Sequence, residues 1–184
     1  MSEKTLYTIG HSTRTLDELV AILKAHGVKT LADVRSIPKS RHVPQFNQDS
    51  LKIELPKHKI HYLPIPELGG RRHTRKDSIN GAWRNASFRG YADYMQTPEF
   101  AAGIEELIKI AQKSPTAIMC AEAVPWRCHR SLIGDAMLVR GWTVLDLMDT
   151  DKQPPHHLTP FAKVTGLKIT YPPQDTDLFP EKPS

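Results

Sequence analysis

The sequence has few cysteines, no long hydrophobic run and no obvious leader segment. Two cysteines in 184 residues are too few for the disulfide framework of a small secreted domain, so we expect two thiols, not a bridge, in a reducing compartment. No stretch approaches the ~18 apolar residues of a membrane span, and residues 1–15 lack a charged segment followed by an apolar run. We therefore expect a cytoplasmic protein with no membrane partner.

Common cofactor motifs are also absent. Neither a Walker loop nor a dinucleotide fingerprint occurs, which argues against hydrolysis of nucleoside triphosphates and against NAD chemistry. Seven residues separate Cys120 from Cys128, more than in the usual structural zinc knuckle, and a fourth zinc ligand would have to come from His11 or elsewhere. We predict no cofactor and leave a metal open.

What the sequence does contain is an alternation of short apolar runs and amphipathic segments. The expected strands are residues 5–9, 28–34, 60–63, 116–119 and 143–148. The expected helices are one that begins with a capping box at Thr15 and Glu18 and ends at Gly27, a weak one over 49–55 that Pro56 terminates, one from Pro98 to Ala111, and one from about Cys128 to Gly141.

This alternation predicts the α/β fold class: a single domain with a mostly parallel sheet of about five strands and helices on both faces, in three layers. We expect residues 1–150 to form this α/β domain with a basic insert at 71–90. Residues 151–184 are expected to be a proline-rich tail that wraps the same domain.

The basic insert holds six basic residues and one acidic residue, an excess equal to the net charge of +5 of the whole chain. Trp83 and Phe88 lie among its arginines, and we find no helical or strand period in it. Such a segment suits an anionic partner, as a lid or nucleic-acid clamp at the rim of a site. In the alternative interpretation, the two aromatic rings anchor the loop on the core and the arginines are only solvated.

Unusual polar residues and glycines follow several of the expected strands. In parallel α/β sheets, ligands bind outside the carboxyl ends of the strands, so we expect these residues to form one site. The candidates are His11, Ser12, Arg35, Ser40, Arg41, Gly69, Gly70, Cys120, Glu122, Cys128, His129 and Arg130. Residues 146–149, which include Asp146 and Asp149, lie at the end of the last expected strand and are expected at the same edge of the sheet.

These motifs resemble a known family. Thr8-Ile9-Gly10-His11-Ser12, Asp33-Val34-Arg35 with Pro38 and Ser40-Arg41, Leu68-Gly69-Gly70, and Cys120-Ala121-Glu122 with Cys128-His129-Arg130 occur in the order and spacing of the bacterial and archaeal "domain of unknown function 488" proteins. The resemblance covers residues 8–130. It implies an intracellular α/β domain whose shared polar residues look like an active site, and it implies no particular reaction.

The catalytic candidates are Glu122, His11 and Cys128. Glu122 would be the general acid or base, unless it only forms an ion pair with Arg35 or Arg130. His11 is either a base or a histidine hydrogen-bonded to backbone at a strand end. Cys128 would be a nucleophile because a helix N-terminus flanked by basic residues lowers a thiol pKa, whereas Cys120 could be a small buried residue.

The remaining candidates would bind substrate. Arg35, Arg41 and Arg130 would hold an anion, and paired glycines let a main chain approach a ligand closely, although such a pair is also common in turns. Ser12, Ser40, Gly69, Gly70 and His129 complete the predicted binding set. The leading hypothesis is an enzyme acting on an anionic small molecule, nucleotide or nucleic acid. The alternatives are a non-catalytic nucleic-acid-binding module and a rhodanese-like sulfur carrier, and the oligomeric state is left open.

Overall fold

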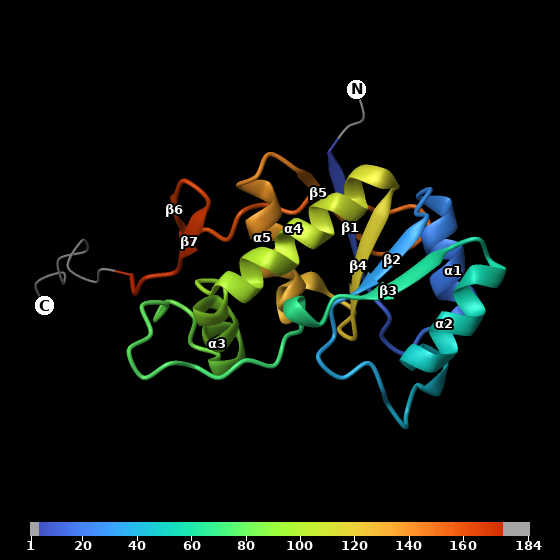
Figure 1. Ribbon diagram of the computed structural model, residues 1–184, viewed down its shortest axis with the longest axis horizontal. Helices are drawn as coiled ribbons and strands as arrows, with labels where there is room; N and C mark the ends of the chain where they lie inside the picture. The colour runs from blue at the N-terminus through green and yellow to red at the C-terminus, as the bar shows by residue number, and fades with distance from the viewer. Residues whose placement is uncertain (1–3, 175–184) are drawn as a thin grey trace, which may run out of the picture.

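Five parallel strands form the centre of the computed structural model, which describes residues 4–174 (Figure 1). The strands are β1 (Thr5–Gly10), β2 (Thr30–Asp33), β3 (His61–Pro64), β4 (Thr116–Cys120) and β5 (Thr143–Leu147). Their order in the sheet is β3-β2-β4-β1-β5, and every pair is parallel. The predicted parallel sheet of about five strands is confirmed.

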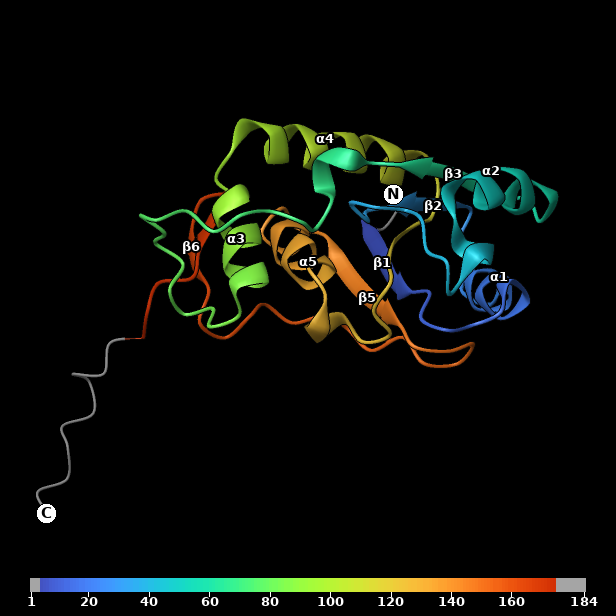
Figure 2. The same cartoon turned by 90° about the horizontal axis from the view of Figure 1, so that it is seen from below.

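Helices cover both faces of this sheet, which confirms the three-layer α/β fold. Helices α1 (Leu16–Ala25) and α2 (Gln48–Lys57) pack on one face, and α4 (Pro98–Lys113) and α5 (Arg130–Leu138) pack on the other (Figures 1 and 2). Side chains that alternate along each strand supply the two cores. Leu6 of β1 belongs to the core with α4 and α5, whereas Ile9 belongs to the core with α1 and α2.

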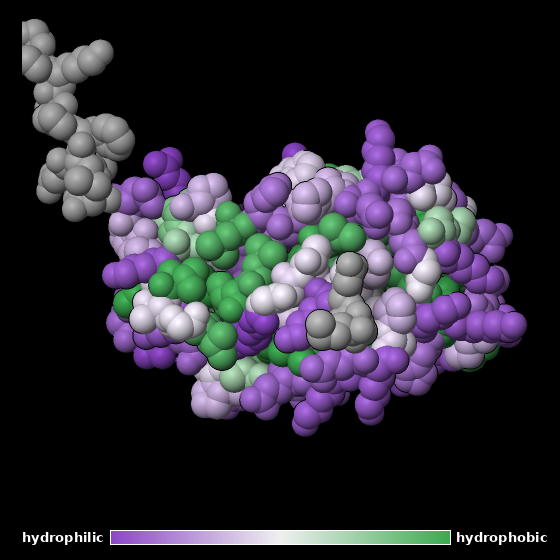
Figure 3. Space-filling model, turned by 90° about the horizontal axis from the view of Figure 1, so that it is seen from above, coloured by the Kyte–Doolittle hydropathy of each residue, from purple (hydrophilic) through white to green (hydrophobic). Residues whose placement is uncertain are grey.

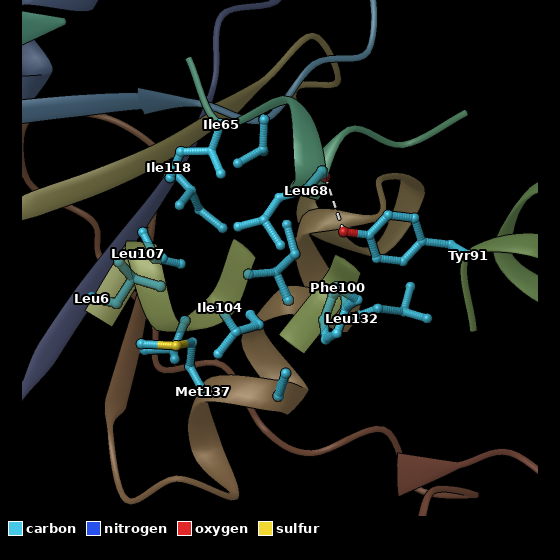
Figure 4. Packing of buried hydrophobic residues seen from close by; sticks show 14 of the residues in the cluster. Leu6, Ile65, Leu68, Tyr91, Phe100, Ile104, Leu107, Ile118, Leu132 and Met137 are labelled. Atoms are coloured by element: carbon cyan, nitrogen blue, oxygen red, sulfur yellow. Dashed lines mark hydrogen bonds between the residues drawn. The ribbon is translucent and has the colours of Figure 1, made fainter. Parts of the chain in front are cut away.

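The larger core lies between the sheet, α4 and α5 (Figure 4). Ile104 and Leu107 of α4 are fully buried there against α5. Tyr91 closes one end of the cluster, and its hydroxyl donates a hydrogen bond to the carbonyl of Leu68 at 2.9 Å. Each buried leucine or isoleucine stabilises the fold by roughly 1.5–3 kcal/mol relative to an exposed one. This packing fixes the start of α5 relative to the sheet.

The helix starts are where the sequence placed them. Thr15 accepts from the amide of Glu18 at 3.1 Å and Glu18 accepts from the amide of Thr15 at 3.0 Å, so the predicted capping box is formed. Thr97 caps α4 at the amide of Phe100, with Pro98 in the first turn.

Two expectations about local structure are wrong. Helix α2 is not terminated before Pro56 but ends one residue later, at Lys57, because a proline this near the end removes only one N–H bond of the last turn. The insert is not irregular throughout: α3 (Ala86–Tyr94) begins in it, capped by the side chain of Asn85.

The tail contains an element that the sequence pattern did not indicate. It is a hairpin of β6 (Lys163–Thr165) and β7 (Lys168–Thr170), with Gly166 at a positive φ in the turn.

The described part of the tail packs against β5 and α5. The amide of His156 bonds to the carbonyl of Val144 at 2.8 Å, and Tyr171 is fully buried. Residues 175–184 of the predicted tail lie outside the described residues. None of the described helices has the length and apolar character needed to cross a bilayer.

Figure 3 views the side where the strands begin. Apolar residues gather on the half of this surface that holds β6, β7 and α5, and polar residues cover the half that holds α1 and α2. Val164 and Leu167 of the hairpin region are 41% and 59% exposed. The candidate site lies at the other end of the strands, on the side seen in Figure 2.

Candidate functional site

The carboxyl ends of β1, β2 and β4 lie side by side, because these strands are neighbours and their registers align. Gly10 is paired with Cys120, and Asp33 is paired with Met119. The pairing continues one step past the strands, since the amide of His11 bonds to the carbonyl of Cys120 and that of Val34 to Met119, both at 3.0 Å. Residues far apart in the sequence therefore meet at one edge of the sheet.

A cavity of about 360 Å³ opens at this edge, and we call it the thiol pocket because both cysteines line it. Its lining consists of Arg35, Ser36, Ile37, Gly70, Arg71, Asn85, Ser87, Phe88, Cys120, Ala121, Glu122, Arg127, Cys128 and His129. Of the twelve predicted site residues, six line the pocket: Arg35, Gly70, Cys120, Glu122, Cys128 and His129. The convergence of distant strand ends is thus observed, while the chemical roles of these residues stay predictions.

Gly10 and Gly70 allow the loops around the pocket to close. A Cβ atom on Gly10 would overlap the carbonyl of Glu122, and one on Gly70 would overlap the ring of His129. The paired glycine after the third strand therefore brings its main chain close to a histidine of the protein. A larger residue at either position would push the pocket wall outward.

The two cysteines are joined in the structure, so the expectation of two separate thiols is wrong. Their sulfur atoms are in bonding contact and their Cα atoms are 7.2 Å apart. The expectation assumes that Cys120, at the end of a strand, lies far from Cys128, at the start of a helix. However, residues 121–127, with the turn η3 (Pro125–Arg127), fold back and return the chain to the end of β4.

Arg130 lies beneath the loop that joins the cysteines and has no exposed surface. Its Nη1 donates to Cys120 Sγ at 2.8 Å and to the carbonyl of Glu122 at 2.6 Å, and its Nη2 donates to the carbonyl of Ala123 at 3.2 Å. Within residues 4–174 no carboxylate lies within ion-pair distance of it, and its Nε has no partner. Burial lowers its pKa to about 10, and the charge of Asp146 opposes that shift, so it stays a cation at neutral pH.

His129 is the partly buried wall of the pocket beside Cys128. Its Nε2 lies 2.7 Å from the carbonyl of Val34, which can only accept, so Nε2 carries the proton. Burial lowers its pKa to about 4, with the charge of Arg130 contributing, and the ring is neutral at pH 7. Its other nitrogen, Nδ1, therefore presents a lone pair 3.5 Å from Cys128 Sγ.

Arg35 is held by Asp33 in a buried ion pair. Nε and Nη2 of Arg35 donate to the two carboxylate oxygens of Asp33 at 2.9 and 2.7 Å, and Tyr62 donates to the same carboxylate at 2.5 Å. Nη2 also reaches the carbonyl of Phe46 at 2.7 Å, and Nη1 reaches Nε2 of His11 at 3.2 Å. Most donors of the predicted anion-binding arginine are consequently used within the protein.

His11 is likewise fully engaged. Its Nδ1 donates to the carbonyl of Ser12 at 2.8 Å, its Nε2 accepts from Arg35, and its ring stacks on Phe46. Burial lowers its pKa, and the charge of Arg35 lowers it further. The geometry is that of the histidine at a strand end that we weighed against a catalytic base.

The other candidates lie away from the pocket lining. Ser40 accepts from the amide of His42 and its own amide bonds to Asn47, so it orders the loop after β2 together with the exposed Arg41. Ser12 has a positive φ and bonds through its amide to Ala121. Gly69 packs on the side chain of Ser36.

Four residues of the insert line one side of the pocket: Arg71, Asn85, Ser87 and Phe88. The insert's aromatic residues Trp83 and Phe88 do not form a platform for successive bases at this pocket, because they stack on each other. Trp83 stacks on Phe88 with ring centroids 4.8 Å apart, and Phe161 meets the indole edge-on at 4.9 Å. This packing on the core is the arrangement that we considered as the alternative to a clamp.

Two rim arginines are outside the predicted binding set, although the sequence places Arg71 in the basic insert and Arg127 among the basic residues that flank Cys128. Arg71 and Arg127 line the pocket, are exposed, and have no side-chain hydrogen bond or ion pair in the part of the chain that the structure describes. For residues 4–174, no cluster of three or more His, Cys, Asp or Glu side chains is arranged to hold a metal ion.

The residues of the site fall into two groups. We call Asp33, Arg35, His129 and Arg130, whose side chains bond to other parts of the protein, the supporting layer. We call the exposed residues Arg71, Glu122 and Arg127 the rim.

Comparison with known families gives one match. The model of the family described as "Domain of unknown function DUF488" matches residues 15–137, more than half of the chain, so the chain belongs to this family. Neither the curated proteins nor the solved structures contain a match to it.

Proposed function

We propose that this member of the DUF488 family is an enzyme that acts on an anionic, nucleotide- or nucleic-acid-like substrate in the thiol pocket. The observation that carries this proposal is the rim. There, Glu122 lines the same cavity as Arg71 and Arg127, whose guanidinium groups have no partner among residues 4–174. A cavity with cationic groups and one accessible carboxylate can bind an anion and move a proton within it.

Binding of the anion is assigned to Arg71 and Arg127 instead of Arg35 and Arg130. Guanidinium groups bind phosphate and carboxylate through paired N–H donors. Of the three arginines that line the pocket, Arg71 and Arg127 have their side-chain donors unused among the described residues, whereas the donors of Arg35 are engaged. The two arise from different segments, the insert and the loop before α5, so they can approach a ligand from different directions.

Proton transfer is assigned to Glu122. Its backbone is fixed because its carbonyl accepts from Arg130, while its side chain is exposed at the pocket. A carboxylate on a fixed backbone with a mobile side chain suits a general acid or base. Cys128, beside the Nδ1 lone pair of His129 and the amide of Arg130 at the start of α5, is assigned as a nucleophile or site-shaping group in its thiol form.

The size of the pocket favours a small substrate over a long strand. About 360 Å³ lies at the low end of the roughly 300–1,000 Å³ of small-molecule sites. Because Trp83 and Phe88 stack on each other, the insert does not offer two rings for successive bases.

The test is a pair of measurements on Glu122→Gln. Nucleoside monophosphates and short single-stranded oligonucleotides are incubated with the reduced protein, products are followed by mass spectrometry, and binding is measured by calorimetry. We expect the variant to bind like the wild type while turnover falls by about 10²–10⁴-fold, the usual contribution of a general acid or base. A turned-over substrate whose rate is unaffected by the substitution would refute the role of Glu122.

The same experiment addresses the two alternatives. Binding of oligonucleotides with no turnover, weakening steeply with salt, would indicate a nucleic-acid-binding module. A persulfide trapped on Cys120 or Cys128 after incubation with a sulfur donor would indicate a sulfur carrier. If the protein shows no anion binding and no turnover, the proposal is excluded.

A further inference from the structure

A second cavity lies on the tail side of α5, and we propose that it binds a planar nitrogen heterocycle bearing an amino group, such as the base of adenosine or cytidine. The cavity has a volume of about 530 Å³ and shares no lining residue with the thiol pocket. We call it the aromatic pocket, after Trp83, Trp126 and Phe161 in its wall. The inference does not depend on the proposed function, because it concerns a different cavity and different side chains.

The wall of the aromatic pocket combines one fixed ring with one exposed ring. Trp83 is held between Phe88 and Phe161, with ring centroids 4.8 and 4.9 Å away. Trp126 belongs to the turn before α5 and is 66% exposed, an unusually high value for the largest apolar side chain. Four prolines, Pro125, Pro154, Pro155 and Pro160, add further flat apolar surface to the wall. Flat apolar surfaces of this kind stack on aromatic rings of any heterocycle.

One end of the aromatic pocket presents a hydrogen-bond acceptor. Asp146 is 6% exposed; its Oδ1 accepts from the hydroxyl of Thr8 at 2.6 Å, whereas its Oδ2 accepts no hydrogen bond from residues 4–174. His156 lies beside it, with Nδ1 3.9 Å from Asp146 Oδ2. The other ring nitrogen, Nε2, donates to Asp135 Oδ1 at 2.9 Å, because a carboxylate oxygen can only accept.

The side chains at this end of the aromatic pocket are held in place. Asp135 is fully buried and also accepts from Thr159 and Tyr171, which fixes the ring that it holds. A ligand that fits must therefore donate hydrogen bonds at its edge while its faces lie against apolar rings. An exocyclic amino group on a heterocycle does both, since it offers two N–H donors in the plane of the ring.

Nucleosides without a phosphate test this inference separately from the thiol pocket. Calorimetric titration with adenosine or cytidine is expected to give saturable binding, and purine riboside, which is adenosine without its amino group, is expected to bind at least about tenfold more weakly. Trp126→Ala should weaken adenosine binding by about tenfold through loss of stacking, with an unchanged unfolding midpoint because the side chain is exposed. Asp146→Asn should also weaken it, while keeping an oxygen for Thr8.

Arg71→Ala is the matched control, since Arg71 is at the rim of the thiol pocket and lies in neither η3 nor the lining of the aromatic pocket. This variant should bind adenosine like the wild type, even if its thiol pocket no longer binds anions. The inference is overturned if no amino nucleoside binds at millimolar concentration, if purine riboside binds as well as adenosine, or if tetramethylammonium binds in their place.

Discussion

The supporting layer and the rim of the thiol pocket contain the same kinds of side chain in opposite states. In the supporting layer, Arg35 and Arg130 are buried and their donors serve Asp33 or loop carbonyls. At the rim, Arg71 and Arg127 are exposed, and their guanidinium groups make no contact of this kind with residues 4–174. A cationic residue next to a site can thus build the site or bind its ligand, and burial with partner geometry distinguishes the two roles.

Removing Asp33 should give the largest effect on stability. Asp33→Ala leaves the Arg35 guanidinium buried without an anion and removes the acceptor of Tyr62. We expect the free energy of unfolding to fall by about 3–5 kcal/mol, the range for breaking one partner of a buried pair. Urea denaturation measures it. Asp77→Ala, which breaks the exposed pair with Arg75, is the control and should leave the midpoint unchanged. Equal effects of the two substitutions would show that Arg35 is not anchored in this way.

Replacing Arg130 should have a smaller effect. Arg130→Met leaves the carbonyls of Glu122 and Ala123 without their donors, but it also relieves the burial of a charge that has no carboxylate beside it. We expect a loss of about 1–3 kcal/mol and faster hydrogen exchange of the amide of Ser12, which bonds to Ala121 of this loop.

Arg140→Met is the matched control for this prediction. Arg140 lies two residues past the end of α5, donates to the carbonyl of Ala136 in that helix and is outside the pocket. Its replacement should leave exchange at Ser12 unchanged. Protection at Ser12 that survives in Arg130→Met would contradict the role of Arg130 in fixing the loop.

The pKa of His129 predicts a dependence of stability on pH. Its folded-state pKa of about 4 lies below the ordinary value of 6.5, so the unfolded chain binds the proton first as the pH falls. Stability should therefore be lost between pH 6.5 and pH 4, with this group contributing a slope of up to about 1.4 kcal/mol per pH unit.

His129→Gln isolates that contribution, because glutamine can donate to Val34 but does not titrate. Urea denaturation across this range should give a shallower slope for the variant than for the wild type. Some slope remains, since burial also lowers the pKa of His11. Parallel slopes in the two proteins would show that His129 is not held neutral.

The sequence predicted the sheet and most helices because short apolar runs and side-chain caps are local signals. Thr15 with Glu18, and Thr97 with Pro98, define helix starts through contacts within four residues. Helix α3 was missed because its stability depends on burial of Tyr91 and Ala92 in the core, which no local pattern reveals. The hairpin of the tail similarly depends on packing that is distant in sequence.

The position of the site was predictable, whereas the division of its residues was not. Strand ends converge in any parallel sheet, and that rule brought Arg35, Cys120, Glu122 and Cys128 to one pocket. Which arginine pairs with which carbonyl or carboxylate is set by tertiary contacts. The same limit explains why Asp146, expected with the other strand-end residues, lies in the aromatic pocket beside His156, which is held by Asp135.

Substitutions at the rim are predicted to weaken anion binding without lowering stability, whereas substitutions in the supporting layer lower stability. Calorimetric titration with ribose 5-phosphate is the most direct measurement, because this probe carries a phosphate and has no base for the aromatic pocket. Arg71→Ala/Arg127→Ala should keep the unfolding midpoint of the wild type and bind the probe at least about tenfold more weakly. Arg84→Ala, an exposed arginine of the same insert outside the pocket lining, should bind like the wild type. Wild-type affinity in the double variant would contradict the assignment of the rim as the anion-binding part of the site.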